Sequence, residues 1–136
     1  MAVWGIGAYF TGKNSKDMSK VFYDNNVACL GWAEADAPAL YKMLMSIKTG
    51  DLIYLKAFAI GQSELRIKAI GIVNDSTIKN YNDLGTGISV KWVKRDLELE
   101  PIAITEKIYK NNVFNNALYE EFNPDIIKVI IDNIII

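Results

Sequence analysis

Apolar and polar residues alternate over much of the middle of the chain, which is the pattern of strands with one buried face. Shorter and more apolar stretches near the N-terminus indicate two further strands. The expected strands are 2–9, 27–32, 51–59, 64–73 and 87–94, with 102–109 as a last strand or an irregular edge. Residues 60–63 contain a glycine and predict a hairpin connection, and the polar residues 75–86 predict a loop.

Apolar residues spaced three or four positions apart predict helices at 17–24 and 114–122 and two longer helices. The first longer helix is expected to begin after Asp36 as its N-cap, with Pro38 in its first turn, and to end at Gly50. Its apolar stripe consists of Leu40, Tyr41, Leu44 and Ile47.

The C-terminal helix is expected to follow Asn123, Pro124 and Asp125, which provide its cap. Its apolar positions fall on one stripe: Ile127, Ile130, Ile131 and Ile134. An aliphatic stripe of this kind either packs in the protein's own core or forms the seam of a homodimer.

The 136 residues, 51% of them apolar and 23% charged, have the composition of one globular domain, so we expect a single domain over 1–136. The order of elements, one strand, two helices and then a run of antiparallel strands, predicts an α+β open β-barrel with peripheral helices. The stretch AVWGIGAYF lacks the features of a signal peptide, and IIKVIIDNIII is too short and polar to span a bilayer. We therefore expect no membrane association.

The chain contains one cysteine, Cys29, and no histidine. A single cysteine forms no disulfide within the chain, which favours a reducing, cytoplasmic setting. Without histidine, the Ser-His-Asp and Cys-His nucleophile pairs and the HExxH zinc centre are excluded. The carboxylates show no acid-base spacing, and Asp51 is expected to be a turn residue at the start of a strand. We therefore expect no enzyme activity, no cofactor and no metal site.

Charge is distributed unevenly along a chain whose net charge is −1. Residues 42–95 contain nine basic and four acidic side chains, and residues 96–136 contain three basic and eight acidic ones. The middle of the chain could therefore present a cationic face to phosphates. Solvated strand faces are the alternative explanation.

Aromatic residues at strand ends are candidates for contact with a planar ligand. Trp32 ends an apolar strand before a loop, where contact with a ligand and a place at the rim of the core are both open. Trp4 is expected to lie in the core rather than to contact a ligand. Trp92 lies within a regular alternation of apolar and polar residues and is also expected in the core. Lys56 lies in an otherwise apolar strand and either snorkels to solvent or meets an anion or carbonyl. The candidate ligand-binding residues are Trp4, Tyr9, Trp32, Lys56 and Phe58.

The order of these features resembles the PUA-like superfamily, in particular EVE domains, YTH domains and the modified-base-reading domains found beside restriction nucleases. The resemblance covers residues 2–95 and depends on five segments: VWGIGAYF, DMSKVFYD, NNVACLGW, MLMSIKTGDLIYLKAF and LRIKAIGIVND. The segment IKTGDLIYLKAF followed by IKAIGIV is the most specific part of the resemblance.

The resemblance implies a pseudo-barrel of five or six strands that extracts one base from a nucleic acid and holds it between aromatic rings. By position, Trp4 and Trp32 correspond to the walls of such a pocket, and Lys56 and Phe58 lie on a strand that borders it. The sequence departs from EVE domains at LKAFAIG, where those domains have a polar, His-Ser-like strand end, so their hydrogen bonds do not carry over. The polar signature of YTH domains is not evident either.

The leading hypothesis is a non-catalytic reader that binds DNA or RNA, with a modified base among its candidate ligands. The alternative is a protein-interaction or small nucleotide-binding accessory domain on the same fold, for example in phage defence, with a homodimer through the C-terminal helix. An enzyme is the third reading and would depend on Lys56 and Tyr54 as its acid-base pair.

Overall fold

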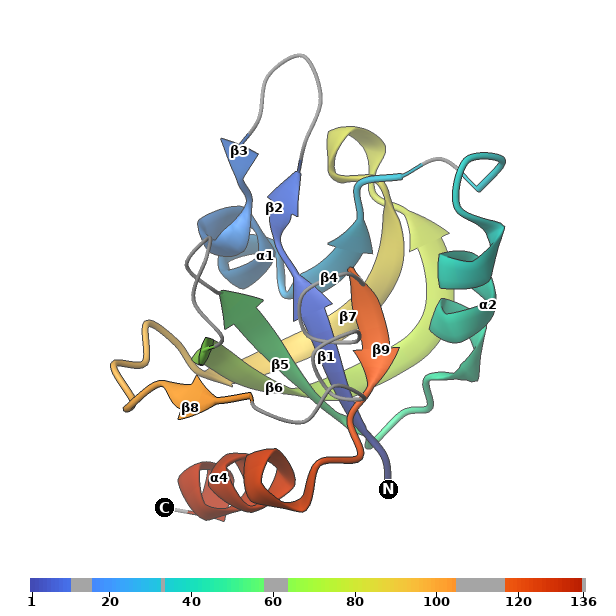
Figure 1. The fold of residues 1–136 in the computed structure, drawn as a ribbon. Coiled ribbons are helices and arrows are strands. Elements are labelled where there is room, and N and C mark those ends of the chain that lie inside the picture. The colour runs from blue at the N-terminus through green and yellow to red at the C-terminus, as the bar shows by residue number, and fades with distance from the viewer. Residues whose placement is uncertain (11–15, 33, 58–63, 105–116, 136) are drawn as a thin grey trace.

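The structure is a computed structural model that describes residues 1–10, 16–32, 34–57, 64–104 and 117–135 (Figure 1). The strands are β1 (Val3–Gly7), β2 (Tyr9–Phe10), β3 (Lys16–Asp17), β4 (Val27–Leu30), β5 (Leu52–Ala57), β6 (Glu64–Asn80), β7 (Thr86–Lys94), β8 (Ile102–Ala103) and β9 (Leu118–Glu120). The helices are α1 (Ser19–Asn25), α2 (Pro38–Ser46), α4 (Pro124–Ile135) and a short 3-10 turn, η1 (Asn82–Leu84).

The α+β class is confirmed, and the main sheet is mixed. Its strand order is β4-β7-β6-β5-β1-β9, with β8 paired to β6, and β2 and β3 form a separate two-stranded ribbon. β1 and β5 run parallel, whereas the other pairs in the main sheet are antiparallel. Among the described residues the sheet is not closed, because β4 and β9 are its two edges.

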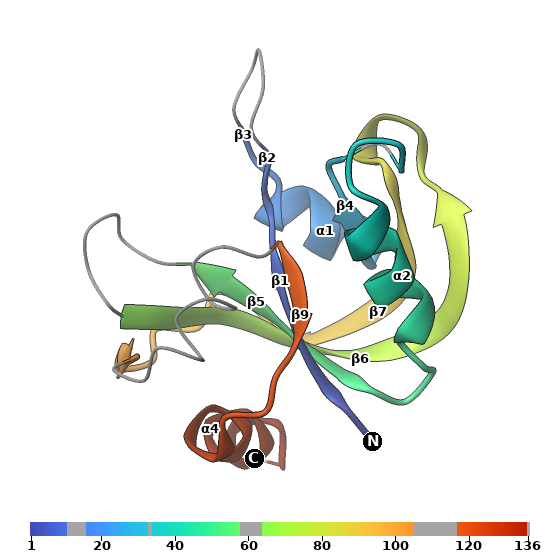
Figure 2. The same ribbon diagram turned by 45° about the vertical axis from the view of Figure 1, so that its right-hand side comes forward.

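β6 is longer than the sequence pattern predicted. The expected loop at 75–86 is wrong for its first half, because β6 continues to Asn80 and pairs there with β7, Lys79 lying opposite Gly87. The residues beyond Val73 are mostly exposed, so backbone pairing rather than burial holds them in the strand. β6 bends along its length, with irregular register at three places, and this bend curves the sheet (Figure 2).

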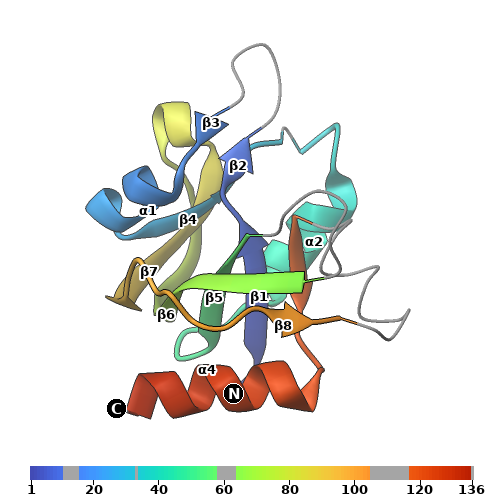
Figure 3. The ribbon, with the colours of Figure 1, turned by 60° about the vertical axis from the view of Figure 1, so that its left-hand side comes forward.

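Successive residues of the strands face two different cores, one on each side of the sheet. In β5, Ile53 and Leu55 pack in the first core with α1 and α2, whereas Leu52 and Tyr54 pack in the second core. α4 packs in the second core and lies below the ends of β1 and β5 in the view of Figure 3.

The helix predictions at 17–24 and before Gly50 are confirmed as α1 and α2, but the predicted cap of α2 is wrong. Ala37 occupies the N-cap position of α2 and provides no side-chain hydrogen bond, so Asp36 does not cap it. Pro38 is its first residue, as expected, because proline needs no backbone donor there.

The predicted helix at 114–122 is wrong within the described residues, where 118–120 form β9 and pair with β1. Leu118 and Tyr119 are buried in opposite cores, as alternate strand residues should be. Residues 114–116 lie outside the described residues, as do the predicted hairpin at 60–63 and positions 105–109 of the predicted last strand, of which 102–103 form β8.

α4 begins as predicted, with the Asn123 side-chain oxygen accepting a hydrogen bond from the Asp125 N–H at 2.9 Å. Its fully buried residues are Ile126 and Ile130, which pack in the second core. The predicted residues Ile127, Ile131 and Ile134 are half-buried and pack against the same core, so the stripe faces the protein's own core, and Ile130 is unavailable to a partner chain. A homodimer through α4 stays a prediction, resting on half-buried residues such as Ile127 and Ile134.

Candidate functional site

Trp32 is the one tryptophan of the three with an accessible indole. β4 is buried along its whole length and is followed by Gly31 and Trp32, where the chain leaves the sheet. The Trp32 side chain is 48% exposed, compared with 2% for Trp4 and 4% for Trp92. The Tyr41 hydroxyl of α2 donates a hydrogen bond to the Trp32 carbonyl oxygen at 2.8 Å, which ties the end of β4 to that helix.

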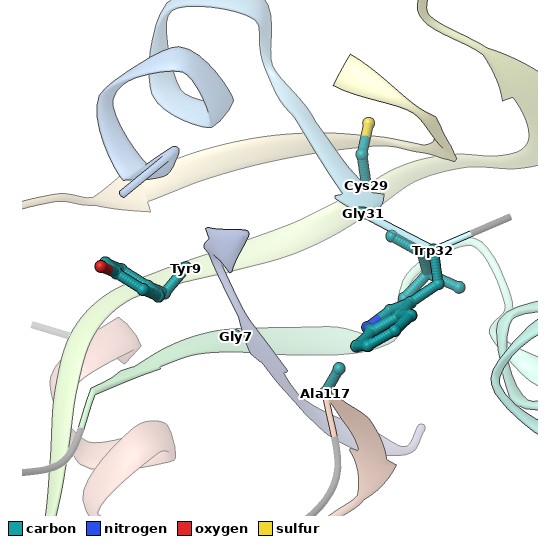
Figure 4. A pocket seen from close by; sticks show the side chains of 7 residues that line it. Gly7, Tyr9, Cys29, Gly31, Trp32 and Ala117 are labelled. Carbon is teal, nitrogen blue, oxygen red and sulfur yellow. The ribbon is translucent and has the colours of Figure 1, made fainter. Parts of the chain in front are cut away.

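Two cavities share Trp32 as a wall. The first, of about 160 Å³, lies where β1, β2 and β4 end (Figure 4). Its lining is Gly7, Tyr9, Cys29, Leu30, Gly31, Trp32 and Ala117. The second, of about 250 Å³, lies between β4, α2 and the turn that contains η1, and it is lined by Leu30, Gly31, Trp32, Tyr41 and residues 82–86.

The two aromatic side chains of the first cavity do not face one another. Tyr9 is 64% exposed, and its ring extends away from Trp32, whereas the Trp32 indole reaches toward Ala117 (Figure 4). The described residues therefore provide one stacking surface at Trp32 with Tyr9 at the rim, rather than two rings placed as a sandwich. A planar ligand would be stacked on one side.

The structure does not place Trp4 at this site. The pleat of β1 directs Trp4 and Ile6 into the first core. The indole N–H of Trp4 donates to Asp51 Oδ2 at 2.9 Å, inside the protein. Trp4 is therefore a core residue, as the sequence reading favoured, and is not available as a pocket wall.

Lys56 lies beside the first cavity without lining it. Its side chain is 8% exposed, and its ammonium lies 5.0 Å from the centre of the Tyr119 ring. A Cβ built on Gly7 would lie 3.4 Å from Lys56 Cε, so the lysine stem packs on the glycine that borders the cavity. Burial lowers the pKa of Lys56 to about 8, with the charge of Glu121 opposing the shift. Phe58, the remaining predicted residue, lies outside the described residues.

A buried polar cluster lies behind Lys56 in the second core. The Tyr54 hydroxyl donates to Glu121 Oε1 at 2.5 Å and lies 2.6 Å from the Tyr119 hydroxyl. Burial is the main cause that raises the pKa of both phenols, so both stay protonated near neutral pH. The hypothesis of an enzyme depends on Tyr54 and Lys56 as an acid-base pair, but the Tyr54 hydroxyl is already hydrogen-bonded inside this cluster.

Cys29 belongs to the wall of the first cavity, but its thiol points away from that cavity, toward Gly87 of β7 (Figure 4). Its side chain is fully buried, and burial raises the pKa of the thiol to about 12. The thiolate, which is the reactive form, is therefore scarce at neutral pH.

Sequence reasoning missed Tyr41, Gly31 and the turn at 82–86 as parts of the site. Tyr41 was assigned to the apolar stripe of its helix, and its hydroxyl was the signal that it needs a polar partner. The turn fell within the predicted loop 75–86, and Gly85, with a φ of 92°, marks the place where the chain turns into β7.

The fold and site define a small α+β protein with a mixed sheet and a half-exposed tryptophan between two cavities. The chain matches no known protein-family model, and no curated protein has a significantly similar sequence. Within the described ranges, no three acidic or cysteine side chains come together to hold a metal ion. No helix in the same ranges has the length and apolar character needed to cross a membrane.

Proposed function

We propose that this chain is a non-catalytic nucleic-acid-binding domain that stacks one base on the indole of Trp32. The observation that supports this most is the half-exposed Trp32 side chain with a cavity on either side. Other large apolar side chains are more exposed, so it is the position of the indole between two cavities, rather than its exposure alone, that supports the proposal.

The size of the cavities suits a single base. Pockets for drug-sized ligands are about 300 to 1,000 Å³, and the two cavities are about 160 and 250 Å³. Stacking of a base on an aromatic ring contributes about 1 to 3 kcal/mol. Flipping a base out of a duplex costs a few kcal/mol, about as much as one stacking contact contributes. A site with one ring is therefore expected to bind a single strand or an already unpaired base.

The PUA-like assignment is part of this proposal. The segment around Lys48, Gly50 and Asp51 joins α2 to β5, in line with the helix-turn-strand order on which the resemblance depends. The curved sheet with helices outside it is compatible with an open barrel of that superfamily. A modified base is among the ligands proposed, and a cytoplasmic setting fits the free, buried thiol of Cys29.

Intrinsic fluorescence tests the proposal, because Trp4 and Trp92 are buried and Trp32 dominates any response to a ligand at the surface. We expect saturable quenching on titration with single-stranded oligonucleotides. Trp32→Ala removes this reporter, so its affinity is measured by the fluorescence anisotropy of a labelled oligonucleotide; it should be weaker by about 5- to 150-fold, the equivalent of the stacking energy. Trp32→Phe is the matched variant that keeps a ring. Equal affinities of the wild type and the Ala variant would contradict the proposal.

A small nucleotide bound alone is the second candidate. It is favoured by Asn82 and Asp83 in the lining of the second cavity, since an amide and a carboxylate can hydrogen-bond a base edge. A mononucleotide that binds as tightly as an oligonucleotide would select this candidate over the reader.

A further inference from the structure

A groove separate from the two cavities beside Trp32 lies at the opposite end of β4. It has a volume of about 340 Å³ and forms where α1 gives way to β4 and where β6 and β7 run side by side. Its polar lining residues are Asn26, Asn74, Ser89, Lys91 and Arg95. The Val90 N–H donates to the Asn26 carbonyl oxygen at 2.9 Å, so the wall formed by Asn26 is fixed to β7.

The Arg95 guanidinium is held in place at this groove. It lies 5.6 Å from the centre of the Tyr23 ring, its Nη2 donates to Asn26 Oδ1 at 3.4 Å, and its Nε donates to the Trp92 carbonyl oxygen at 3.4 Å. These two bonds use two of the five N–H donors that a guanidinium has. Three donors remain for a phosphate, and the planar guanidinium can bind phosphate oxygens through two of them at once.

The other groups of the groove suit an anion as well. Lys91 is exposed on the outer side of β7, and Asn74 donates to the Ser89 hydroxyl at 3.4 Å, placing an amide and a hydroxyl beside the two cations. Two carboxylates lie nearby. Asp75 is engaged by a hydrogen bond from the Thr77 N–H, and its pKa is lowered by that bond and by the charge of Lys79.

The second carboxylate belongs to Asp96, which follows Arg95 in the chain and is exposed. Its charge helps to raise the pKa of Tyr23, after burial, so Asp96 lies near that ring, and it is not part of the lining of the groove. The groove itself is therefore lined by two cations and three neutral polar side chains.

The spacing between this groove and Trp32 fits one strand of nucleic acid. Six residue steps separate Asn26 from Trp32, and β4 accounts only for Val27–Leu30, so at about 3.3 Å per residue the two positions lie at most about 20 Å apart. A strand stacked as in a duplex rises about 3.4 Å per nucleotide, so at most about six stacked nucleotides cover this distance, and a more extended single strand covers it with fewer. Lys79, exposed on β6 opposite Gly87, lies between the two places.

We propose that this groove binds the phosphate backbone of the strand whose base stacks on Trp32, within about six nucleotides of that base. The inference rests on the proposed function and adds a second contact to it. Lys91 and Arg95 each neutralise one phosphate, and Asn26, Asn74 and Ser89 donate hydrogen bonds to phosphate oxygens.

The test compares Lys91→Gln/Arg95→Gln with Lys48→Gln/Lys128→Gln, a control pair of exposed lysines that removes the same charge elsewhere. The probes are a labelled oligothymidine of twelve nucleotides and one of three, titrated between about 50 and 200 mM salt. For the longer probe, the groove variant should reduce the slope of log affinity against log salt by about 1.4, or 0.7 for each phosphate contact. For the trinucleotide, which is too short to reach the groove, the slope should not change.

Three results would overturn the inference. An unchanged slope for the longer probe, with Trp32 quenching intact, would remove the groove and leave the proposed function standing. An equal reduction in the control pair would show a general charge effect. Absence of Trp32 quenching by either probe would refute the proposed function, and the groove with it.

Discussion

Replacement of Asp51 by alanine should be among the most destabilising single changes in the protein. The Asp51 carboxylate, 6% exposed, accepts three hydrogen bonds where β1, α2 and β5 meet. The donors are the N–H groups of Ala2 and Lys48, at 3.0 and 2.9 Å, and the indole N–H of Trp4, at 2.9 Å. The sequence analysis placed Asp51 correctly, in a turn at the start of a strand, but it did not predict these three hydrogen bonds.

The magnitude follows from the donors left without a partner. Hydrogen bonds to a charged group contribute about 1.5 to 3 kcal/mol each, and the three share one acceptor, so we expect a loss of about 3 to 5 kcal/mol. This is a large part of the 5 to 15 kcal/mol that typically separates folded from unfolded chains, about a fifth or more of it.

The free energy of unfolding that the Asp51 carboxylate contributes should depend on pH. Burial raises the pKa of Asp51, but the hydrogen bonds from Ala2, Lys48 and Trp4, together with the N-terminal charge, outweigh it and lower the pKa below its ordinary 3.8. A lowered pKa stabilises the fold above the unfolded-state pKa, and this contribution is lost as the pH falls through the folded-state pKa. The difference between the wild type and Asp51→Asn should therefore shrink at acidic pH.

Urea unfolding followed by circular dichroism at pH 7 and about pH 3 measures both effects. Asp24→Ala, which removes an exposed carboxylate at the end of α1, is the control and should change little. An Asp51→Ala variant within about 1 kcal/mol of the wild type at pH 7 would refute the reasoning, as would an Asp51→Asn effect that is equal at both pH values.

Three further predictions follow from packing. Gly5→Ala should lower the thermal midpoint of unfolding, because the new Cβ would lie 2.6 Å from Tyr119 Cζ and 2.8 Å from Tyr54 Cζ. Overpacking of this kind costs about 1 to 3 kcal/mol, and an unchanged midpoint would contradict the prediction. Cys29 should react with a thiol reagent only at the rate of unfolding, and fast labelling in native buffer would show that its burial is misjudged. Trp32→Ala should cost less than about 1 kcal/mol of stability by urea unfolding, since the side chain is half-exposed; a larger loss would make Trp32 a core residue.

The elements that sequence reasoning predicted well are those whose side-chain pattern reflects their burial. β5 alternates between two cores and α2 presents an apolar stripe, and both were predicted. The second half of β6 was missed because its polar residues are held by backbone pairing with β7, which leaves no pattern in the side chains. β9 was mistaken for a helix because Tyr119 packs over Gly5, a contact between residues far apart in the sequence.

The site was predicted in part. Trp32 and Tyr9 lie at one cavity, as expected from aromatic residues at strand ends. Trp4 was separated from them by the pleat of β1, which directs Trp4 and Ile6 into the first core, as the sequence analysis favoured for Trp4. The cluster around Tyr54 and Glu121 depends on the placement of β9 and could not have been predicted without it.

The central claim, that Trp32 alone among the tryptophans meets the nucleic acid, is tested most directly by the three indole N–H signals in a nitrogen-proton correlation spectrum. The N–H groups of Trp4 and Trp92 are buried and donate to Asp51 and to the Val27 carbonyl oxygen, and Trp32→Phe assigns the third signal. On titration with a single-stranded oligonucleotide, the Trp32 signal should shift saturably while the other two stay in place. A spectrum in which the Trp32 signal does not move, or moves no more than those of Trp4 and Trp92, would contradict the account.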